Sequence, residues 1–397
     1  MAKLSSSNGK KANIPKLRFP EFTEEWEEIS FSNLFDFLPN NTITRADLSN
    51  NGVIRNIHYG DVLIKFGSVL SIKSDDIPFI KNTDTVNNNV FLKNGDIIIA
   101  DTAEDETVGK VTEICDIDTE KVVSGLHTIP CRTKKNFAPK FLGYYMNSPA
   151  YHYQLFPLMQ GVKVLSISKS NIVVTVIHYP DILQQTKIAN LLSLIDKKIS
   201  VQRQLVESLK KYKRGLLRDV FSRKIRLTKS DDEWKNQHIG DILHILHGRD
   251  YKEFKNPNGK YPVLGTSGII DYSNKFLCNW SCVLIGRKGT IDRPQYMDTP
   301  FWTVDTLFYT KPKNGQDPKF QYYLFQTINW KKYNEASGVP SLSSSTIASI
   351  PISMPKIEVQ NKIAKFFTLF DKKICMCESE LKSLIKIKKA LLQQLFI

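Results

Sequence analysis

The stretch that decides the fold is Pro180-Asp-Ile-Leu-Gln-Gln-Thr-Lys-Ile-Ala189, which returns as Pro355-Lys-Ile-Glu-Val-Gln-Asn-Lys-Ile-Ala364. The two copies are 175 residues apart without a gap, and 18 of the 43 aligned pairs from Pro180 to Ser222 are identical. An internal repeat of this kind indicates a duplicated structural unit. We therefore take the chain as two related halves, each ending in the same element.

Both copies have the periodicity of long amphipathic helices. Apolar residues recur at steps of three and four, and a proline stands just before each run, where it can open a helix. A helix of about 40 residues is a rod of roughly 60 Å. Two equivalent helices in one chain can bury each other's apolar stripe, which predicts a coiled-coil-like pair. The predicted seam is Ile188, Leu191, Leu192, Ile195, Ile199, Leu205, Leu209, Tyr212, Leu216 and Val220, with Ile363, Phe366, Phe367, Phe370, Ile374, Leu381, Ile385, Leu391, Leu392 and Leu395 in the second helix.

A second set of repeats marks the other end of each half. The segment from Trp26 to Pro180 is 33 residues longer than the segment from Trp234 to Pro355. We call these two diverged segments the bodies, and the repeated ends and helices around them the frame. The matching pairs are Leu17-Arg-Phe19 with Ile225-Arg-Leu227, Glu24-Glu-Trp26 with Asp232-Glu-Trp234, Pro139-Lys-Phe141 with Pro318-Lys-Phe320, and the loop from Gly161 to Ser166 with that from Gly338 to Ser343.

The bodies are predicted to be mixed α+β domains. Short β-rich runs separated by Gly and Asn turns predict strands, and an aromatic helix is expected after Pro139 and again after Pro318. The predicted strands cover residues 96–100, 121–123, 128–132, 282–285 and 303–309.

Composition limits the classes of protein that fit. The 397 residues are 41% hydrophobic, which suits two or three domains that each bury a core. Of the net charge of +15, residues 186–226 carry +9 and residues 361–397 carry +5, so the basic character belongs to the two helices. The longest apolar runs are too short to span a bilayer, and no secretory signal is visible, so we expect a cytoplasmic protein without membrane contact. Six cysteines fit a reduced compartment.

Catalytic motifs are not apparent. The chain has no G-x-x-x-x-G-K-[ST] loop, no G-x-G-x-x-G after a strand and no Asn-Pro-Pro-aromatic motif, which argues against a self-contained motor or methyltransferase. His244-x-x-His247 and Cys278-x-x-x-Cys282 could be two halves of a zinc site, but ordinary loop histidines and core cysteines are favoured. Asp250 with Glu253-Phe-Lys255 has the acidic spacing of a magnesium site, but a solvated loop is favoured. We therefore expect no catalytic residue and no metal site.

Two equivalent loops and one basic turn are suited to binding DNA. They combine glycines with hydroxyl and amine side chains, which bond phosphates and base edges. A solvated turn is the alternative for any single residue, but the set favours recognition. The candidate DNA-binding residues are Lys163, Ser166 and Lys169 in the first half and Arg287, Lys288, Ser341 and Ser343 in the second.

With both repeats in view, the chain resembles the specificity subunit of type I restriction-modification enzymes, the HsdS family. The resemblance rests on the Pro15 to Pro20 opening with Glu25-Trp26, on the Gly161 and Gly338 loops, and on the helices with Gln185-x-Lys-Ile-Ala189 and Gln360-x-Lys-Ile-Ala364. It implies an α+β fold with two target-recognition domains in a pseudo-two-fold arrangement, separated by two long antiparallel coiled-coil helices. The implied parts are a flexible basic tail at 1–16, recognition domains at 17–179 and 225–354, and spacer helices at 180–224 and 355–397.

The resemblance also implies a function and partners. The chain would be a non-catalytic subunit that recognises a bipartite, asymmetric double-stranded DNA target, with one half-site per domain. It would dock two modification subunits, which bring S-adenosylmethionine to methylate adenine, and two restriction subunits, which use ATP and Mg; this chain itself would bind no cofactor. The helix residues expected to act in spacing and docking are Ile188, Leu192, Ile195, Ile199, Leu209, Leu216, Ile363, Phe367, Phe370, Ile374, Leu384 and Leu391.

Two other classes of function remain open at this point. One is an adaptor with two protein-binding modules on a coiled-coil spacer, and the other is a stand-alone DNA-binding protein such as a repressor. Salt-sensitive binding to a split DNA sequence would argue against the adaptor. Co-purification with a methyltransferase would argue against the repressor.

Overall fold

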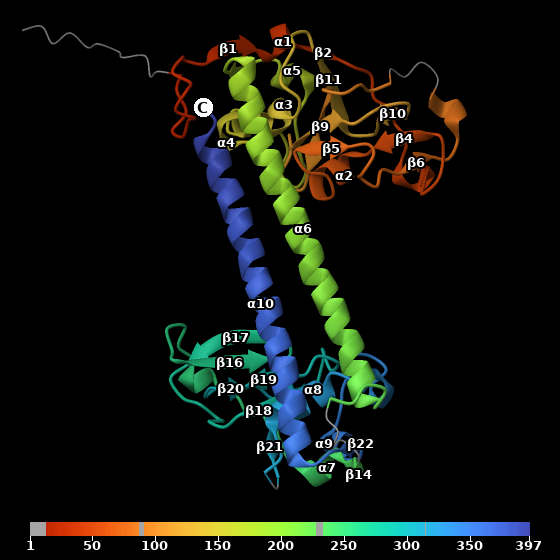
Figure 1. Cartoon of the computed structure of the whole chain (residues 1–397), viewed down its shortest axis with the longest axis vertical. Coiled ribbons are helices and arrows are strands. Elements are labelled where there is room, and N and C mark those ends of the chain that lie inside the picture. The colour runs from red at the N-terminus through yellow and green to blue at the C-terminus, as the bar shows by residue number, and fades with distance from the viewer. Residues whose placement is uncertain (1–12, 87–90, 228–232, 314) are drawn as a thin grey trace, which may run out of the picture. The chain divides into compact units, whose positions relative to one another are not determined.

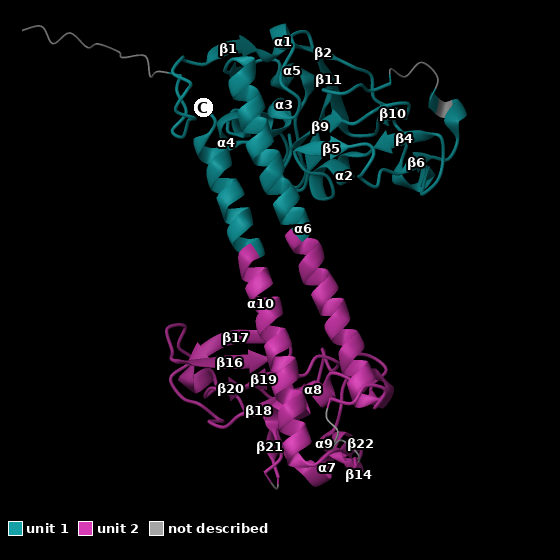
Figure 2. Ribbon diagram, viewed as in Figure 1, with its two compact units in different colours: residues 1–201, 381–397 teal, residues 202–380 magenta. Residues whose placement is uncertain are grey.

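The computed structural model describes residues 13–86, 91–227, 233–313 and 315–397. They form two compact units, coloured in Figure 2: unit 1 comprises residues up to Val201 together with Leu381–Ile397, and unit 2 comprises Gln202–Glu380. Most of the predicted tail at 1–16 lies outside the described residues. Each unit combines one β-rich body with parts of two long helices.

The two predicted long helices are confirmed. Helix α6 covers Ile182–Phe221 and helix α10 covers Ile357–Gln394, so they have 40 and 38 residues and begin two residues after Pro180 and Pro355 (Figure 1). The side chain of Asp181 accepts hydrogen bonds from the backbone N–H groups of Leu183 and Gln184, which satisfies part of the first turn of α6. Among the described residues, no helix is long and apolar enough to cross a membrane.

The helices pack antiparallel. Within unit 2, Gln202 of α6 donates a hydrogen bond to Glu380 of α10 over 3.1 Å, and Lys213 pairs with Asp371 over 2.6 Å. The residue number rises along one helix while it falls along the other, which is the antiparallel direction. In unit 1 the other end of α10 packs on the first turns of α6, with Leu391 and Leu392 beside a core that includes Ile188 and Leu192.

Unit 1 is built on small sheets. Among its described residues, a five-stranded sheet has the order β2-β11-β7-β9-β5 and a four-stranded sheet the order β10-β4-β6-β3. The pairs β1–β13 and β12–β8 are antiparallel. The strands are β1 Glu27–Ser30, β2 Phe35–Phe37, β3 Leu48–Ser49, β4 Ile54–Ile57, β5 Val69–Ser71, β6 Phe79–Ile80, β7 Ile97–Ala100, β8 Thr102–Ala103, β9 Val111–Cys115, β10 Lys121–Ser124, β11 Thr128–Thr133, β12 Leu165–Ser166 and β13 Val176–Tyr179, and the short helices are α1 Phe31–Leu34, α2 Tyr59–Ile64, α3 Phe141–Met146, α4 Pro149–His152 and α5 Lys169–Ile172.

Unit 2 repeats the frame with a shorter body. Its described residues form sheets of order β15-β21-β18-β19 and β17-β16-β20, and an antiparallel pair β14–β22. The strands are β14 Lys235–His238, β15 Leu243–His247, β16 Tyr261–Gly265, β17 Gly268–Ser273, β18 Cys282–Gly286, β19 Gln295–Met297, β20 Trp302–Thr303, β21 Leu307–Pro312 and β22 Pro351–Met354, and the short helices are α7 Ile239–Ile242, α8 Pro318–Phe325 and α9 Ser344–Ala348.

Most of the predicted body elements are confirmed, with one correction. Strands β7, β10, β11 and β18 match four of the predicted runs, and α3 and α8 are the aromatic helices expected after Pro139 and Pro318. The run 303–309 is not one strand: β20 ends at Thr303 and β21 begins at Leu307. The backbone N–H of Leu307 donates to the carbonyl of Val304, which closes a turn where a single strand was predicted.

An equivalent aromatic cluster packs each body against the C-terminal end of one long helix. In unit 1, Trp26 and Phe141 both pack on Phe396, two residues beyond the end of α10, and their ring centroids lie 6.3 and 5.9 Å from that of Phe396. In unit 2, Trp234 and Phe320 pack on Phe221 at the end of α6, at 6.1 and 5.4 Å. The repeated Trp and Phe of the sequence therefore pack each body against the C-terminal end of a long helix.

Candidate DNA interface and partner surface

In unit 2 the structure brings together all four predicted DNA-binding residues. Lys288 and Ser341 face each other across an isolated antiparallel bridge. Beside this bridge the backbone N–H of Leu342 donates to the carbonyl of Arg287 over 2.9 Å, and that of Gly289 donates to Pro340 over 2.8 Å. The basic turn after β18 and the loop before α9, far apart in the sequence, thus form one surface.

Lys288, Arg287 and Ser343 differ in how far their side chains are engaged within the protein. Lys288 is exposed, whereas the guanidinium of Arg287 donates to the carbonyl oxygen of Asp305 over 3.1 Å. The hydroxyl of Ser343 accepts from the N–H of Thr346 at the start of α9 and lies 2.8 Å from a carboxylate oxygen of Glu335. Hydrogen bonds from Thr346 and Ser343 hold the pKa of Glu335 below its ordinary value. Ser343 therefore orders the loop, and Lys288 has the side chain most available for a phosphate.

A hairpin beside this surface was not identified from the sequence. Gly289 packs near the β16–β17 turn, since a Cβ at Gly289 would lie 3.8 Å from the hydroxyl of Thr266. Strand β17 exposes Ile269, Ile270 and Tyr272, by 56%, 47% and 40% respectively. Exposed apolar groups next to cations can contact thymine methyl groups. The signal in the sequence was the apolar pair directly after Gly268.

In unit 1 the predicted loop lies beside an acidic segment. Ser166 and Gln160 bond each other through their backbones over 2.8 and 2.9 Å, and β12 pairs with β8 at Thr102 and Ala103. Lys163 is exposed, and the ammonium of Lys169 lies 5.4 Å from the ring centroid of Phe37. The residues after β8, Glu104-Asp-Glu106, are exposed. The two units therefore present related loops in different electrostatic surroundings.

A polar network occurs twice where body and helices meet. In unit 1 the hydroxyl of Tyr144 donates to Asp196 of α6 over 2.9 Å, and Lys388 of α10 pairs with the same carboxylate over 2.6 Å. In unit 2 Tyr323 donates to Asp371 of α10 over 2.8 Å, and Lys213 of α6 pairs with Asp371 over 2.6 Å. Burial raises the pKa of Tyr323 and of Tyr144, so both hydroxyls keep their protons. Each network ties one body to both long helices.

A glutamine repeated in the sequence locks the start of each long helix. Gln185 accepts from the backbone N–H of Ala138 over 2.9 Å and donates to the carbonyl of Pro180 over 2.8 Å. Gln360 likewise accepts from Asp317 over 3.2 Å and donates to Pro355 over 2.9 Å. Both glutamines are buried. The repeated Gln-x-Lys-Ile-Ala pattern thus has a structural reason in each unit.

Most residues of the predicted helix seam are at least partly buried, but three of them are exposed. The docking and spacer residues predicted above are all at least partly buried: Ile188, Leu192, Ile199, Ile363, Phe367 and Ile374 are buried, and Ile195, Leu209, Leu216, Phe370, Leu384 and Leu391 are half-buried. Leu205, Tyr212 and Ile385 were predicted in the seam and are instead exposed. Val206 is buried beside the exposed Leu205, because a 3.5-residue repeat continued from Ile199 falls on Gln202 and Val206 and not on Leu205. Leu217 and Cys377 are buried as well.

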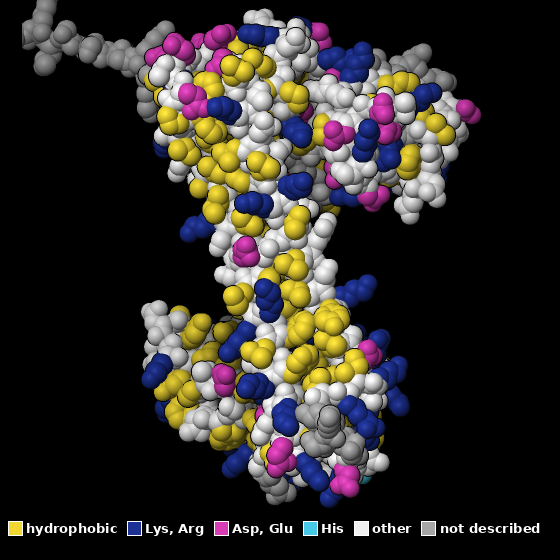
Figure 3. Space-filling view, viewed as in Figure 1, with side chains coloured by type: hydrophobic (Ala, Val, Ile, Leu, Met, Phe, Trp, Pro, Cys, Tyr) yellow, Lys and Arg dark blue, Asp and Glu magenta, His cyan; other side chains and the backbone are white. Residues whose placement is uncertain are grey.

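The exposed apolar residues of the helices occur as pairs of equivalent positions. Leu194 and Leu369 are exposed by 61% and 58%, Val201 and Met376 by 57% and 68%, and Tyr212 and Ile387 by 60% and 50%. Each pair is separated by the repeat offset of 175. Figure 3 shows hydrophobic side chains on the helix surface within both units. The exposed apolar positions therefore follow the repeat of the two helices.

The candidate metal and nuclease residues do not assemble into a site. The described residues contain no group of three or more side chains placed to hold a metal ion. Cys278 and Cys282 are buried with their sulfur atoms 3.9 Å apart, whereas His244 and His247 are exposed. The carboxylate of Asp250 accepts from the N–H groups of Tyr251 and Lys252, and Lys255 pairs with Asp271 over 2.9 Å. These acids therefore order their own loop.

Comparisons with known proteins agree on one family. Residues 231–386 match the type I restriction modification DNA specificity domain. The chain is 22% identical over 427 aligned residues to a Methanocaldococcus jannaschii protein named as the type I restriction enzyme MjaX specificity subunit; the match covers 97% of this chain and 96% of that protein.

Solved structures have the same fold. A type I restriction-modification S subunit from M. genitalium superposes with a TM-score of 0.64 at 18% identity, covering 96% of this chain and 99% of that one. A chain from a structure of complex assembly and conformational transition of the type I R-M system gives a TM-score of 0.54 at 14% identity, covering 92% and 96%. Two β-rich bodies, each followed by a long helix, are the shared architecture. With its matched specificity domain and its likeness over nearly its full length to a specificity subunit, this chain contains the DNA specificity domain of type I restriction-modification systems and is similar to their non-catalytic specificity (S) subunits, the HsdS family.

Proposed function

We propose that this subunit reads a bipartite, asymmetric DNA target, with the loops of unit 1 contacting one half-site and those of unit 2 contacting the other. The observation that carries the proposal is the repeated frame around diverged loops. Trp26, Tyr144 and Gln185 have equivalents in unit 2 that make the same contacts, whereas the loop surroundings differ between the units. A frame kept constant around variable loops is the arrangement expected of two readers with different sequences to read.

The chemistry of the loops supports two different half-sites. Lys288 and the exposed apolar residues of β17 suit phosphate contacts and thymine methyl groups. In unit 1 the loop with the exposed Lys163 leads into β12, and β12 pairs with β8, which the exposed acids of residues 104–106 follow. Carboxylates accept hydrogen bonds from the amino group of cytosine. The recognition domains proposed here are residues 17–179 and 225–354. The helices at 180–224 and 355–397 set the gap of unread base pairs.

The helices also support docking of two copies of one partner. Leu194, Val201 and Tyr212 on α6 and their equivalents on α10 give each helix the same exposed apolar pattern. One kind of protein can therefore bind twice, which fits two modification subunits; two restriction subunits complete the proposed assembly. S-adenosylmethionine would be bound by the modification subunits and ATP with Mg by the restriction subunits.

The test is to map methylated adenines in DNA from cells that express this chain with its modification subunit. We expect a split motif with an adenine in each half. Lys288→Ala should weaken methylation through the half-site read by unit 2, and Lys163→Ala should act on the other. The exposed Lys252 of unit 2 provides a matched control as Lys252→Ala. A continuous motif, or a motif in which exchanging residues 26–179 for another recognition domain alters neither half, would overturn the proposal.

A further inference from the structure

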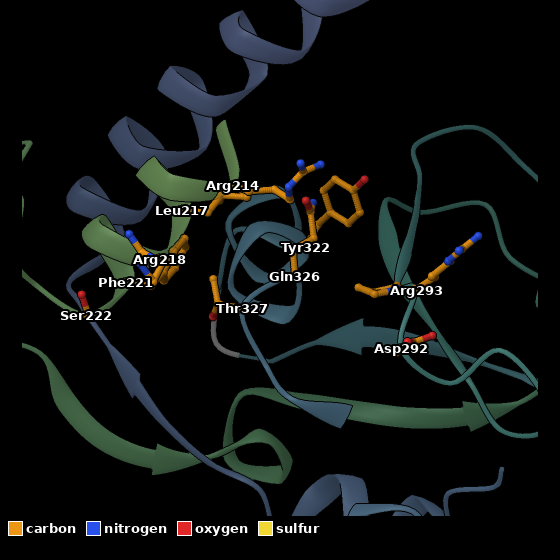
Figure 4. Close-up of a pocket in the computed structure, with 11 residues that line it drawn as sticks. Arg214, Leu217, Arg218, Phe221, Ser222, Asp292, Arg293, Tyr322, Gln326 and Thr327 are labelled. Carbon is orange, nitrogen blue, oxygen red and sulfur yellow. The ribbon is translucent and has the colours of Figure 1, made fainter. Parts of the chain in front are cut away.

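Unit 2 contains a pocket of about 700 Å³ that none of the roles above uses (Figure 4). Its apolar lining comes from Leu217 and Phe221 near the end of α6 and from Tyr322 of α8. Three cations, Arg214, Arg218 and Arg293, line it as well. In the view of Figure 4, Arg214 and Arg293 extend on opposite sides of Tyr322. The pocket thus combines an apolar floor with a basic rim.

The pocket has an excess of positive charge and a hydrogen-bond donor without an acceptor. Arg218 bonds its neighbour Asp219 over 3.1 Å, and Asp292 is paired with Lys331 over 3.1 Å. The acid on the rim is therefore already neutralised, and the rim keeps a net positive charge. The side-chain nitrogen of Gln326 is buried and has no hydrogen-bond partner among the described residues. A buried donor without an acceptor costs free energy, so a ligand that brings a carbonyl or carboxylate is favoured.

In unit 1 the position equivalent to this pocket is covered by another segment of the same chain. The repeat places Gly143 where unit 2 has Tyr322, and Asn147 where it has Gln326. The amide of Asn147 is satisfied: it accepts from the N–H of Val111 over 3.0 Å and donates to the Val111 carbonyl over 2.7 Å. The carbonyl oxygen of Ser68 would lie only 2.2 Å from a Cβ at Gly143, so the chain passes directly over this position.

The covering segment in unit 1 is residues 63–68, at the end of α2 and just beyond it. Lys110 holds it by donating from its ammonium to the carbonyls of Leu63 and Phe66 over 2.7 and 3.1 Å. Leu63 packs on the core cluster that also contacts Leu391 and Leu392. The body of unit 2 is shorter, and among its described residues the equivalent place is left as the pocket. A segment of another protein can therefore supply in unit 2 what the chain supplies for itself in unit 1.

We propose that this pocket binds an acidic segment of the modification subunit. Its aspartate or glutamate side chains would pair with Arg214 and Arg293, an apolar side chain would rest on Phe221 and Tyr322, and a backbone carbonyl would accept from Gln326. A polypeptide is favoured over DNA because the floor is apolar and because a polypeptide fills the counterpart in unit 1. This inference rests on the docking of modification subunits proposed above.

The test measures binding of the full chain to the purified modification subunit in the absence of DNA. Arg214→Glu combined with Arg293→Glu should raise the Kd by about 100-fold, since each reversal turns an attraction into a repulsion. Thr327→Trp, which fills the pocket without changing charge, should also weaken binding. Lys252→Glu, with the same charge change on an exposed residue of unit 2 outside the pocket, should bind like the unmodified chain. Melting curves of all variants establish that they fold.

A photo-crosslinking amino acid at Thr327 identifies the occupant. We expect a crosslink to an acid-rich peptide of the modification subunit. If the arginine variants bind as tightly as the unmodified chain, or if the crosslink forms only to DNA in the ternary complex, the pocket proposal is refuted while the docking function stands. If the unmodified chain does not bind the modification subunit at all, the proposed function itself fails, and the pocket proposal fails with it.

Discussion

The duplicated Tyr–Asp–Lys network gives a sharp prediction about local stability. Asp371→Asn keeps the shape of the side chain but removes its charge, which Tyr323 and Lys213 both use. The side chain of Lys213 is only 12% exposed, so water replaces its partner poorly. The matched variant in the other unit is Asp196→Asn, where Lys388 is 20% exposed.

The magnitude follows from the two contacts. A hydrogen bond to a charged group contributes about 1.5–3 kcal/mol and one to a neutral amide about 1 kcal/mol. The hydrogen bond from Tyr323 should therefore contribute about 1 kcal/mol less in the variant. The ion pair is partly exposed and should contribute about another 1 kcal/mol. The total of about 2 kcal/mol corresponds to roughly 30-fold more frequent local opening.

Hydrogen exchange read by mass spectrometry is the suitable assay, because a chain with two units does not unfold in a single two-state step. Asp371→Asn should speed exchange in peptides of α8 and of residues 357–380, and leave those of α3 unchanged. Asp196→Asn should do the reverse. The reasoning is refuted if both variants exchange like the unmodified chain, or if either variant loosens both units equally.

Three further predictions concern single residues. Burial raises the pKa of Glu113 to about 7, although the N–H groups of Lys140 and Gly143 that it accepts from oppose this shift. Because the raised pKa favours the protonated acid in the fold, unit 1 should lose up to about 3 kcal/mol of stability as pH rises from about 4.5 to 7. Glu113→Gln should flatten that pH dependence in melting curves. Gly143→Ala should destabilise unit 1 by about 2 kcal/mol or more, because the new Cβ would meet the Ser68 carbonyl. Hydrogen exchange of unit 1 peptides, measured at increasing urea concentration, would reveal this loss of stability. Lys288→Ala should weaken DNA binding and reduce the slope of log K against log salt by about 1, and an unchanged slope would mean that Lys288 contacts no phosphate.

The sequence predicted the frame well because the frame is local and duplicated. A helix is specified by short-range periodicity, so the repeat after Pro180 and Pro355 was enough to place α6 and α10. The exact seam was less predictable. Following the apolar residues at steps of three and four assigned Leu205 and Tyr212 to the interface, whereas the 3.5-residue repeat continued from Ile199 passes through the polar but buried Gln202 to the buried Val206.

The candidate site depended on contacts between residues that are distant in the sequence. Glycines and hydroxyls in a loop indicated binding. The local sequence did not predict that Lys288 lies across from Ser341, or that the Ser343 hydroxyl caps α9. The Tyr–Asp–Lys networks join three separate segments each, so their polar residues could not be distinguished from ordinary surface charge before the chain was folded. The exposed Ile269 and Ile270 were missed because an apolar pair in a short strand is typical of a core.

The sequence by itself determined that the chain is two copies of one frame, that each copy ends in a long amphipathic helix, and that the net charge lies in those helices. These properties follow from periodicity and repetition, which need no knowledge of distant contacts. Only the tertiary structure decided which apolar helix residues stay exposed and which loops meet, and that residues 63–68 cover in unit 1 the place that is an open, arginine-rimmed pocket in unit 2. Such outcomes depend on how diverged segments pack on a shared frame, and packing between distant segments is specified by three-dimensional complementarity.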